Sequence, residues 1–255
     1  DAFTSIRFQD QQQQGYLGKR LNKNLAERLL KLDEVGTLDG YLERPGHHPW
    51  AGEHIGKYLE TASNVWRNTG DERLKMQMDR LMYQLVHAQL PDGYLGTYTP
   101  EDYWTSWDVW SHKYNLYGLL GYYKATSYQP ALDACKKIGD LLCKTFGNKP
   151  GQLDIILAGT HIGMASTSVL DPMVELYKYT GDKKYLDFCY YILEAWEQKN
   201  GPKIISALLT KGKVTAVGNG KAYEMLSTFV GLANLYRTTG DVAMLKPLFI
   251  AWNDI

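Results

Sequence analysis

The amino-acid sequence predicts an all-α fold built from successive helical hairpins. One observation is a short repeat around Thr69, Thr126, Thr180 and Thr239, which are 57, 54 and 59 residues apart. Another is that apolar residues recur at spacings of three and four on both sides of each repeat, as in amphipathic helices. Such units are longer than those of open arrays with repeats of ~34 or ~40–47 residues. They favour an (α/α)6 toroid, in which inner helices surround a cavity and return loops shape its mouth.

Each repeat predicts one helix, a tight turn, a second helix and a longer return loop. In the turn, glycine ends the first helix in the left-handed conformation and aspartate caps the next helix. A further helix is expected near 17–34, which makes about nine helices, and the stretch 203–217 could form a short β-hairpin. The helices before the turns are expected at 55–68, 114–125, 168–179 and 224–238, and those after the turns at 72–89, 130–146, 183–198 and 242–252.

We expect residues 1–255 to form a single helical domain that is an incomplete ring. Six hairpins of this length would require roughly 340 residues. The chain ends at Ile255 inside a helix-like segment that has no capping signal. The toroid is therefore expected to be truncated at its C-terminal end.

Charge and composition exclude two classes of partner and favour a third. The 28 Lys and Arg residues balance 28 Asp and Glu residues, so the chain lacks the attraction that nucleic acids and anionic membranes require. The chain also contains 7 Trp, 19 Tyr and 6 Phe. Trp and Tyr combine a flat apolar face with a polar edge, and they can line a cleft that binds sugar rings. The alternative is a large helical core with tyrosines at its boundary.

The densest polar and aromatic cluster opens the helix expected at 114–125. Trp107, Asp108 and His112 lie there, and Asp108 and His112 are spaced to share one helix face with Asn115. A carboxylate and an imidazole near a helix start can bind hydroxyl groups or transfer a proton. The alternative is a capped amphipathic helix with a histidine at its boundary.

A second cluster opens the helix expected at 55–68. It contains Trp50, Glu53, His54 and Lys57. Glu53 and Lys57 are four residues apart, so they can form a surface ion pair, whereas Trp50, Glu53 and His54 can equally face the cavity. Two return loops add Tyr94, which follows an Asp-Gly turn, and His161, which precedes another inner helix.

Four runs of the sequence that contain most of these residues resemble a known family. They are PWAGEHIGKYLETASNVWRNTGDERL, DGYLGTY, WSHKYNLYGLLGYYKATS and LDPMVELYKYTGDKKYL. They resemble the beta-L-arabinofuranosidase-like glycosidases, glycoside hydrolase family 127 and its relatives, in order over residues 15–255. The resemblance implies a catalytic toroid that binds an oligosaccharide or plant polysaccharide and cleaves arabinofuranosides. It also implies, for the characterised type, a zinc-bound cysteine nucleophile and a glutamate acid/base.

The cysteines of this chain depart from that pattern. None of Cys135, Cys143 and Cys189 has a cysteine neighbour or a glutamate two residues before it. We therefore expect no metal ligand, no cofactor and no catalytic residue in this segment, and zinc only in a longer protein. Glu53 and Asp108 are the nearest catalytic candidates.

The resemblance implies that this segment supplies a cleft wall and is inactive without downstream residues. The expected sugar-binding residues are Trp50, Glu53, His54, Lys57, Tyr94, Trp107, Asp108, His112 and His161. Two alternatives stay open: an unsaturated-uronyl hydrolase or sugar epimerase on the same toroid, and a non-enzymatic helical scaffold that binds a partner protein. A periplasmic or secreted location fits a polymeric glycan, although no residue decides it.

Overall fold

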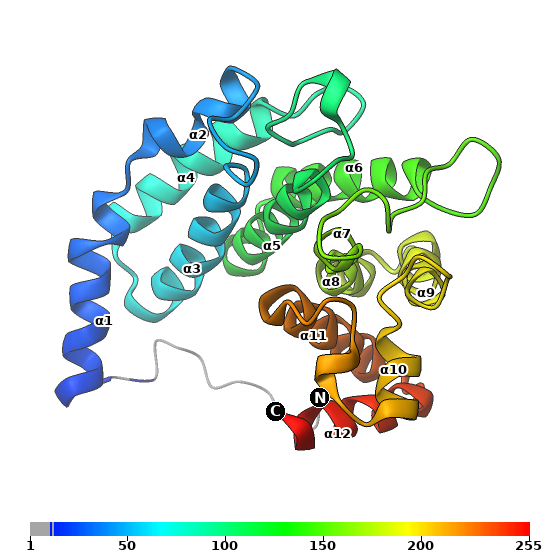
Figure 1. Ribbon diagram of the computed structural model, residues 1–255. Helices are drawn as coiled ribbons and strands as arrows, with labels where there is room; N and C mark the ends of the chain where they lie inside the picture. Colours follow the sequence, from blue (N-terminus) through cyan, green and yellow to red (C-terminus); the bar gives the residue numbers. More distant parts are fainter. Residues whose placement is uncertain (1–10, 12) are drawn as a thin grey trace.

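A computed structural model of the chain describes residue 11 and residues 13–255 (Figure 1). Its α-helices are α1 (Gly15–Glu27), α2 (Glu34–Leu42), α3 (Glu53–Thr69), α4 (Glu72–His87), α5 (Asp108–Thr126), α6 (Gln129–Thr145), α7 (Met164–Thr167), α8 (Leu170–Thr180), α9 (Lys183–Trp196), α10 (Ile204–Lys211), α11 (Ala222–Thr239) and α12 (Leu245–Asp254). Short 3₁₀ helices lie at Leu29–Lys31, Pro100–Asp102, Val214–Ala216 and Val242–Met244. The described residues form no β-strand, only an isolated bridge between Phe146 and Leu153. The predicted all-α class is confirmed.

Eight of these helices form the four predicted hairpins, namely α3 with α4, α5 with α6, α8 with α9 and α11 with α12. The first helix of each hairpin packs on the next, so that α3 contacts α5, α5 contacts α8, and α8 contacts α11. Figure 1 shows these four inner helices following a curved path, with α1 and α12 at its opposite ends. The curvature confirms a helical toroid, of which this chain provides four hairpins.

The threonine of each hairpin turn bridges the end of one helix and the start of the next. The hydroxyl of Thr69 donates to the carbonyl four residues before it and accepts from the N–H two residues after it. Thr126, Thr180 and Thr239 make the same two hydrogen bonds. This shared geometry explains why threonine recurs beside the glycine and aspartate of the repeat.

The residue that follows each threonine has a left-handed backbone. Gly70, Gly181 and Gly240 have φ angles of 66°, 69° and 75°, which glycine adopts without steric cost. The aspartate after each glycine caps the next helix, as predicted. The second turn places Ser127 at this position with a φ angle of 58°, where a β-carbon is strained.

Helix α5 is enclosed on nearly all sides, because 13 of its 19 residues are buried. Helix α3 crosses it closely at Gly56, where an added β-carbon would lie 2.0 Å from the carbonyl oxygen of Tyr114. The facing residue, Gly118, would meet the carbonyl oxygen of Gly56 at 2.7 Å. The two backbones touch, so no larger side chain fits between them. This close packing fixes α5, whose first turn carries the candidate site.

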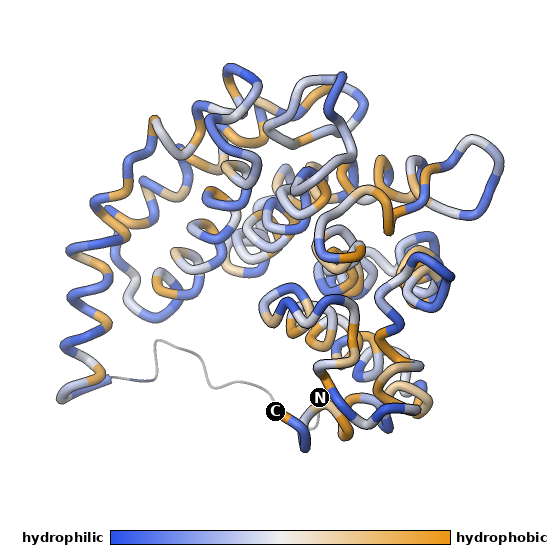
Figure 2. The backbone as a smooth tube through the Cα atoms, in the orientation of Figure 1, coloured by the Kyte–Doolittle hydropathy of each residue, from blue (hydrophilic) through white to orange (hydrophobic). Residues whose placement is uncertain are grey.

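The apolar core lies between neighbouring helices of the curved path. Most buried apolar side chains belong to one continuous cluster, and a small second cluster centres on Trp110, Tyr114 and Ala165. In Figure 2 orange and blue segments alternate along the hairpin helices, as expected for helices with one buried face. No helix in the described part of the chain is sufficiently long and apolar for a membrane span.

The helix expected near 17–34 is shorter than predicted, because α1 ends at Glu27 and a 3₁₀ helix follows at Leu29–Lys31. A separate helix that was not predicted, α2, begins at Glu34, where the side chain of Asp33 accepts a hydrogen bond from the N–H of Gly36 and caps it. With α7 and α10, this raises the nine expected helices to twelve among the described residues.

The β-hairpin considered for 203–217 is wrong. Residues Ile204–Lys211 form α10, and Val214–Ala216 form a 3₁₀ helix. Ile204 and Leu208 are both buried, and their spacing of four residues places them on one helix face. The apolar run is therefore helical, although its β-branched residues also suit a strand.

The hairpin turns yield a matched pair of stability predictions. Replacing Gly181 by alanine places a β-carbon in a left-handed backbone and should lower the free energy of unfolding by about 1 kcal/mol. Replacing Ser127 by glycine relieves the same strain and should raise it by about 0.5–1 kcal/mol. Urea unfolding midpoints check both changes. Shifts of the same sign for the two variants would contradict this account of the turns.

Candidate functional site

Aromatic side chains from four segments meet beside the N-terminal ends of the inner helices. The ring centroids of Trp50 and Trp107 are 6.4 Å apart, and those of Trp107 and His161 are 5.6 Å apart. Tyr223, in the first turn of α11, lies 5.4 Å from Trp110. Trp50 and Tyr223 are 46% and 49% exposed, so a ligand can reach them. We call Trp50, Trp107, His161 and Tyr223 the aromatic rim.

Glu53 lies beside this rim and has both carboxylate oxygens engaged. One oxygen accepts a hydrogen bond from the indole N–H of Trp110, and the other is 2.7 Å from the ammonium group of Lys57. The ammonium group also lies 4.5 Å from the ring centre of Tyr114 and 5.5 Å from that of Tyr223. Of the two alternatives that the spacing left open for Glu53 and Lys57, the ion pair is present. In this arrangement Glu53 holds Trp110 and Lys57 in place.

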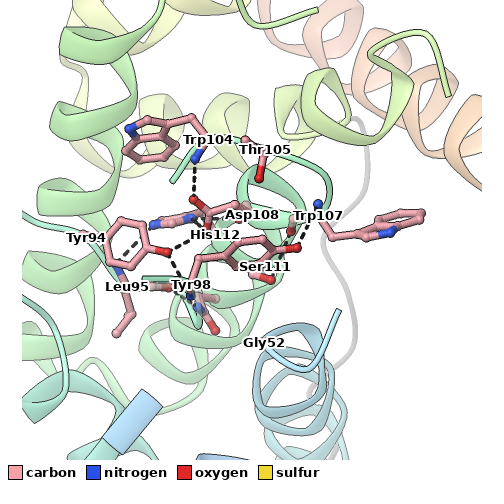
Figure 3. Close-up of polar contacts among 12 residues, drawn as sticks. Gly52, Tyr94, Leu95, Tyr98, Trp104, Thr105, Trp107, Asp108, Ser111 and His112 are labelled. Atoms are coloured by element: carbon pink, nitrogen blue, oxygen red, sulfur yellow. Dashed lines mark hydrogen bonds and ion pairs between the residues drawn. The ribbon is translucent and has the colours of Figure 1, made fainter. Parts of the chain in front are cut away.

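Asp108 is fully buried at the start of α5 (Figure 3). Its Oδ1 accepts a hydrogen bond of 2.8 Å from the hydroxyl of Tyr94, and its Oδ2 accepts one of 2.9 Å from the backbone N–H of Trp104. Burial raises the pKa of this carboxyl group, because a charged group loses its hydration inside the protein. The two hydrogen bonds attach the return loop between α4 and α5 to the helix at two points, Tyr94 and Trp104.

His112 lies one turn further along α5 and is also fully buried. Its Nε2 accepts a hydrogen bond of 3.1 Å from the N–H of Leu95, and its Nδ1 lies 2.9 Å from the carbonyl oxygen of Asp108. Because Leu95 donates to Nε2, these partners assign the proton to Nδ1. The imidazole therefore ties the loop around Leu95 to the first turn of α5.

Tyr98 extends this network to the aromatic rim. Its N–H donates to the hydroxyl of Tyr94 at 3.2 Å. Its own hydroxyl donates to the carbonyl of Pro49 at 2.7 Å and accepts from the N–H of Trp107 at 3.2 Å. Pro49 directly precedes Trp50, so one tyrosine fixes the backbone at two rim residues. Figure 3 shows the indole of Trp107 directed away from the network.

Strained backbone occurs in the loops that lead into α5 and α7. Trp104 and Ser106 have φ angles of 63° and 51°, and His161 and Ile162 both have 55°. Residues other than glycine rarely adopt this region, and such strain gathers at functional sites. The Asp108 carboxylate holds Trp104 in this conformation through its hydrogen bond to the N–H.

The structure corrects the expectation that Tyr94, Asp108 and His112 contact a ligand. All three side chains are 0% exposed, and their polar atoms bind one another and nearby backbone groups. They hold the loops that present the rim. Asp108 is therefore shielded from solvent, and both carboxylate oxygens of Glu53 already have partners in this structure.

His54 and Lys57 line a groove of about 710 Å³ between α1, α2 and α3. His54 is exposed, and Lys57 is partly buried. The groove adjoins the rim through His48, whose ring centre lies 4.8 Å from that of Trp50 and 5.4 Å from that of His54. The structure therefore brings Trp50, His54 and Lys57 to neighbouring positions beside the aromatic rim, and their contact with a sugar stays a prediction.

The sequence patterns did not single out the acidic residues that open the last two inner helices. Every inner helix has an acidic residue in its first turn, namely Glu53, Asp108, Asp171 and Glu224. The helix dipole stabilises a negative charge at this position. Glu224 is buried, with its carboxylate 4.0 Å from His161 Nε2. An alignment of the four hairpins on their inner-helix starts was the signal that could have found it.

Lys113 is a buried cation beside the site. Its ammonium group lies 4.0 Å from the ring centre of Trp110 and 4.9 Å from that of Tyr114. Within the described part of the chain this group has no hydrogen-bond partner. Burial lowers the pKa of Lys113 to about 7, although the nearby carboxylate of Asp171 acts in the opposite direction.

Comparison with known proteins identifies the family. Residues 10–255 match the family model described as beta-L-arabinofuranosidase, GH127 catalytic domain. The chain belongs to this family. A non-reducing end beta-L-arabinofuranosidase of Bifidobacterium longum subsp. longum is 25% identical over 240 residues, which cover 79% of this chain and 34% of that protein.

Solved GH127 structures share this fold. A GH127 beta-arabinofuranosidase superposes with a TM-score of 0.76 at 22% identity, covering 98% of this chain and 43% of that one. A GH127 beta-L-arabinofuranosidase from Geobacillus stearothermophilus T6 superposes with a TM-score of 0.73 at 17% identity, covering 96% of this chain and 44% of that one. The chain therefore spans less than half the length of these relatives.

The zinc-bound cysteine implied by the GH127 resemblance does not fit the cysteines of this chain. Cys135 and Cys189 are buried in the core, and burial raises the pKa of both thiols well above the ordinary value. Burial also raises the pKa of Cys143 to about 12. Zinc binds thiolates, which these environments disfavour. Across the residues that the structure describes, no group of three or more His, Cys, Asp or Glu side chains is placed to hold a metal ion.

The network at Asp108 predicts a specific loss of stability. In an Asp108→Asn variant the amide nitrogen cannot accept a hydrogen bond, so one of two buried donors loses its acceptor. The free energy of unfolding should fall by about 1–3 kcal/mol, and hydrogen exchange at the amides of Leu95 and Tyr98 should become faster. Asp92→Asn is the control, because its exposed side chain accepts from the N–H of Tyr94 in a way that asparagine can reproduce. Equal stability of the two variants would contradict the assigned role of Asp108.

Lys113 predicts a pH dependence of stability. Its folded pKa of about 7 lies below that of an exposed lysine, so between these two values the unfolded chain binds more protons than the folded chain. The Lys113 contribution to the free energy of unfolding therefore increases as pH rises above 7. From pH 7 to 9 the wild type should gain about 1–2 kcal/mol relative to Lys113→Met. Denaturant unfolding at each pH measures this, with Lys124→Met, an exposed residue of α5, as the control. A pH-independent difference would contradict the assignment.

Proposed function

We propose that this chain forms the first part of a glycoside hydrolase catalytic domain whose aromatic rim binds arabinofuranoside-type units of a plant glycan. The observation that supports this most directly is the convergence of Trp50, Trp107, His161 and Tyr223 at the ends of the inner helices. Aromatic faces stack on the C–H faces of sugar rings. The GH127 relatives, which are named as arabinofuranosidases, support the choice of sugar.

We also propose that the 255-residue chain does not hydrolyse these glycosides unaided. Both carboxylate oxygens of Glu53 are engaged, and Asp108 is fully buried. The thiols of the three cysteines are held in their protonated form by burial. These observations support sugar binding, rather than bond cleavage, as the role of the segment.

The alternative of a uronyl hydrolase or epimerase drew on Asp108 and His112. Such an enzyme needs the carboxylate and the imidazole to reach one sugar. Both side chains are fully buried and form hydrogen bonds with backbone groups. The alternative thus loses the observation that favoured it.

Sugar binding is tested with the wild-type chain and an oligosaccharide that carries terminal arabinofuranosyl units. Trp50→Ala and Trp107→Ala should each weaken binding about threefold or more, because stacking on an aromatic face is worth about 0.5–1.5 kcal/mol. Trp252→Ala is the matched control, since Trp252 is 80% exposed on α12. Titration calorimetry or NMR measures the dissociation constants. Equal affinity in all three variants, or no binding by the wild type, would overturn the proposed function.

A further inference from the structure

Helices α3, α5 and α11 border a hollow of about 420 Å³, which is within the usual range of about 300–1,000 Å³ for ligand sites. Arg28, Lys57 and Thr61 line both this hollow and the groove between α1, α2 and α3, so the two spaces adjoin. Tyr223 lines the hollow and also belongs to the aromatic rim. The hollow is therefore a separate space next to the rim, and the proposed function leaves it without a role.

The charged side chains that line the hollow are mostly cationic. Arg28, Lys57 and Lys113 contribute positive groups, and Glu60 is the one carboxylic acid among the described residues that line it. Lys57 is paired with Glu53, which leaves Arg28 and Lys113 to act on a ligand. Burial raises the pKa of Glu60, so the charged form of this side chain is disfavoured. This balance favours a negatively charged ligand.

Lys113 provides a second, independent sign of a ligand. The residue is 1% exposed, and its Nζ has no hydrogen-bond partner in the part of the chain that the structure describes. The ring centres of Trp110 and Tyr114 lie 4.0 and 4.9 Å from this atom. The rings stabilise the charge, but they are no substitute for oxygen acceptors. Because a buried donor without an acceptor is costly, an anionic oxygen in the hollow would stabilise this arrangement.

Two carboxylates outside the hollow, those of Asp171 and Glu224, also act on the charge of Lys113. Neither lines the hollow, and neither accepts a hydrogen bond from the ammonium group. The two oxygens of Asp171 accept hydrogen bonds from Tyr117 and Asn234 instead. The ammonium group of Lys113 therefore keeps its donors for a ligand.

We infer that the hollow binds the carboxylate of an acidic sugar unit, which accepts a hydrogen bond from the ammonium group of Lys113 while Arg28 adds a second positive charge. Hydrogen bonds between ionised groups are the stronger ones, and a carboxylate has two oxygens that accept. A singly charged carboxylate is favoured over phosphate, because Glu60 in the wall opposes a further negative charge. Thr61 and Ser227 add hydroxyl groups that can bind those of the sugar.

The inference goes beyond the proposed function and rests on it only for the claim that the ligand is a sugar. The rim is proposed to bind an arabinofuranoside-type unit, whereas the hollow takes an acidic unit at a second position. Tyr223 belongs to both places, so the two units would be neighbours in one glycan. The hollow thus adds a charge requirement to the glycan that the chain binds.

The test compares two ligands that differ in one group. The methyl glycosides of D-galacturonic acid and D-galactose carry a carboxylate and a hydroxymethyl group at the same position, and inorganic phosphate is the third probe. The wild-type chain should bind the galacturonate about tenfold or more tightly than the galactoside, as expected for hydrogen bonds to a charged group. The NMR signal of the Trp110 indole N–H reports binding, because this ring lies beside Lys113. The signal of Trp252 on α12 is the internal control.

Three variants test the residues of the hollow. Lys113→Met should weaken galacturonate binding about tenfold or more. Arg28→Gln, which changes an exposed side chain, should weaken it about twofold to fivefold. Glu60→Gln should strengthen it about twofold, because a like charge is removed from the wall.

Two further variants are matched controls for the loss of a positive charge. Lys124→Met, at an exposed position of α5, and Arg20→Gln, at an exposed position of α1, should bind galacturonate as the wild type does. Circular dichroism verifies that each variant is folded. If Lys113→Met is unfolded, Arg28→Gln and Glu60→Gln still decide the question by their opposite effects.

The outcomes separate this inference from the proposed function. Equal affinity of the wild type for galacturonate and galactoside, or wild-type affinity for galacturonate in the variants of Lys113 and Arg28, would overturn the inference. Phosphate that binds as tightly as galacturonate would show capture of any anion and would overturn it too. In these cases the proposed function stands if Trp50→Ala and Trp107→Ala weaken binding of the arabinofuranosyl oligosaccharide. If the wild type binds galacturonate but not this oligosaccharide, the proposed function fails and the assignment of the hollow stands.

Discussion

The buried carboxylate of Asp108 is the constraint on which the geometry of the site depends. A carboxylate without water is costly unless donors surround it, and here the hydroxyl of Tyr94 and the N–H of Trp104 supply them. Both donors belong to the return loop that leads into α5, so satisfying one charge orders that loop. Tyr98 connects this loop to the rim, because its hydroxyl donates to the carbonyl of Pro49 and accepts from the N–H of Trp107. The aromatic rim is partly exposed, but hydrogen bonds of the buried network fix the position of its backbone.

The hairpin architecture could be predicted because the chemistry of its turns is local. Within three consecutive residues, threonine hydrogen-bonds the end of one helix, glycine adopts the left-handed backbone, and aspartate caps the start of the next helix. The break between α1 and α2 and the helical state of 204–211 were not predicted. There a single capping aspartate, or burial of one face against other helices, outweighs the local periodicity. Tertiary packing decides such ambiguous apolar runs.

The candidate site could be predicted only in part, because the spacing of residues along a helix does not show what packs against them. Composition and position singled out Trp50 and Trp107, whose rings lie 6.4 Å apart in the structure. The i, i+4 spacing of Asp108 and His112 showed that they share a helix face, but not whether that face meets a ligand or a packed loop. Glu224 lies in no local motif, and the unsatisfied ammonium group of Lys113 is evident only when the neighbouring helices are in place.

The most direct measurement is a two-dimensional NMR spectrum of the tryptophan indole N–H groups, recorded with and without an arabinofuranosyl oligosaccharide. A rim held in place by the buried network predicts that the signals of Trp50 and Trp107 shift on binding. The signals of Trp66 on α3 and Trp252 on α12, which lie away from the rim, should stay unchanged. Shifts confined to Trp66 or Trp252, or none at Trp50 and Trp107 at saturating sugar, would contradict the account.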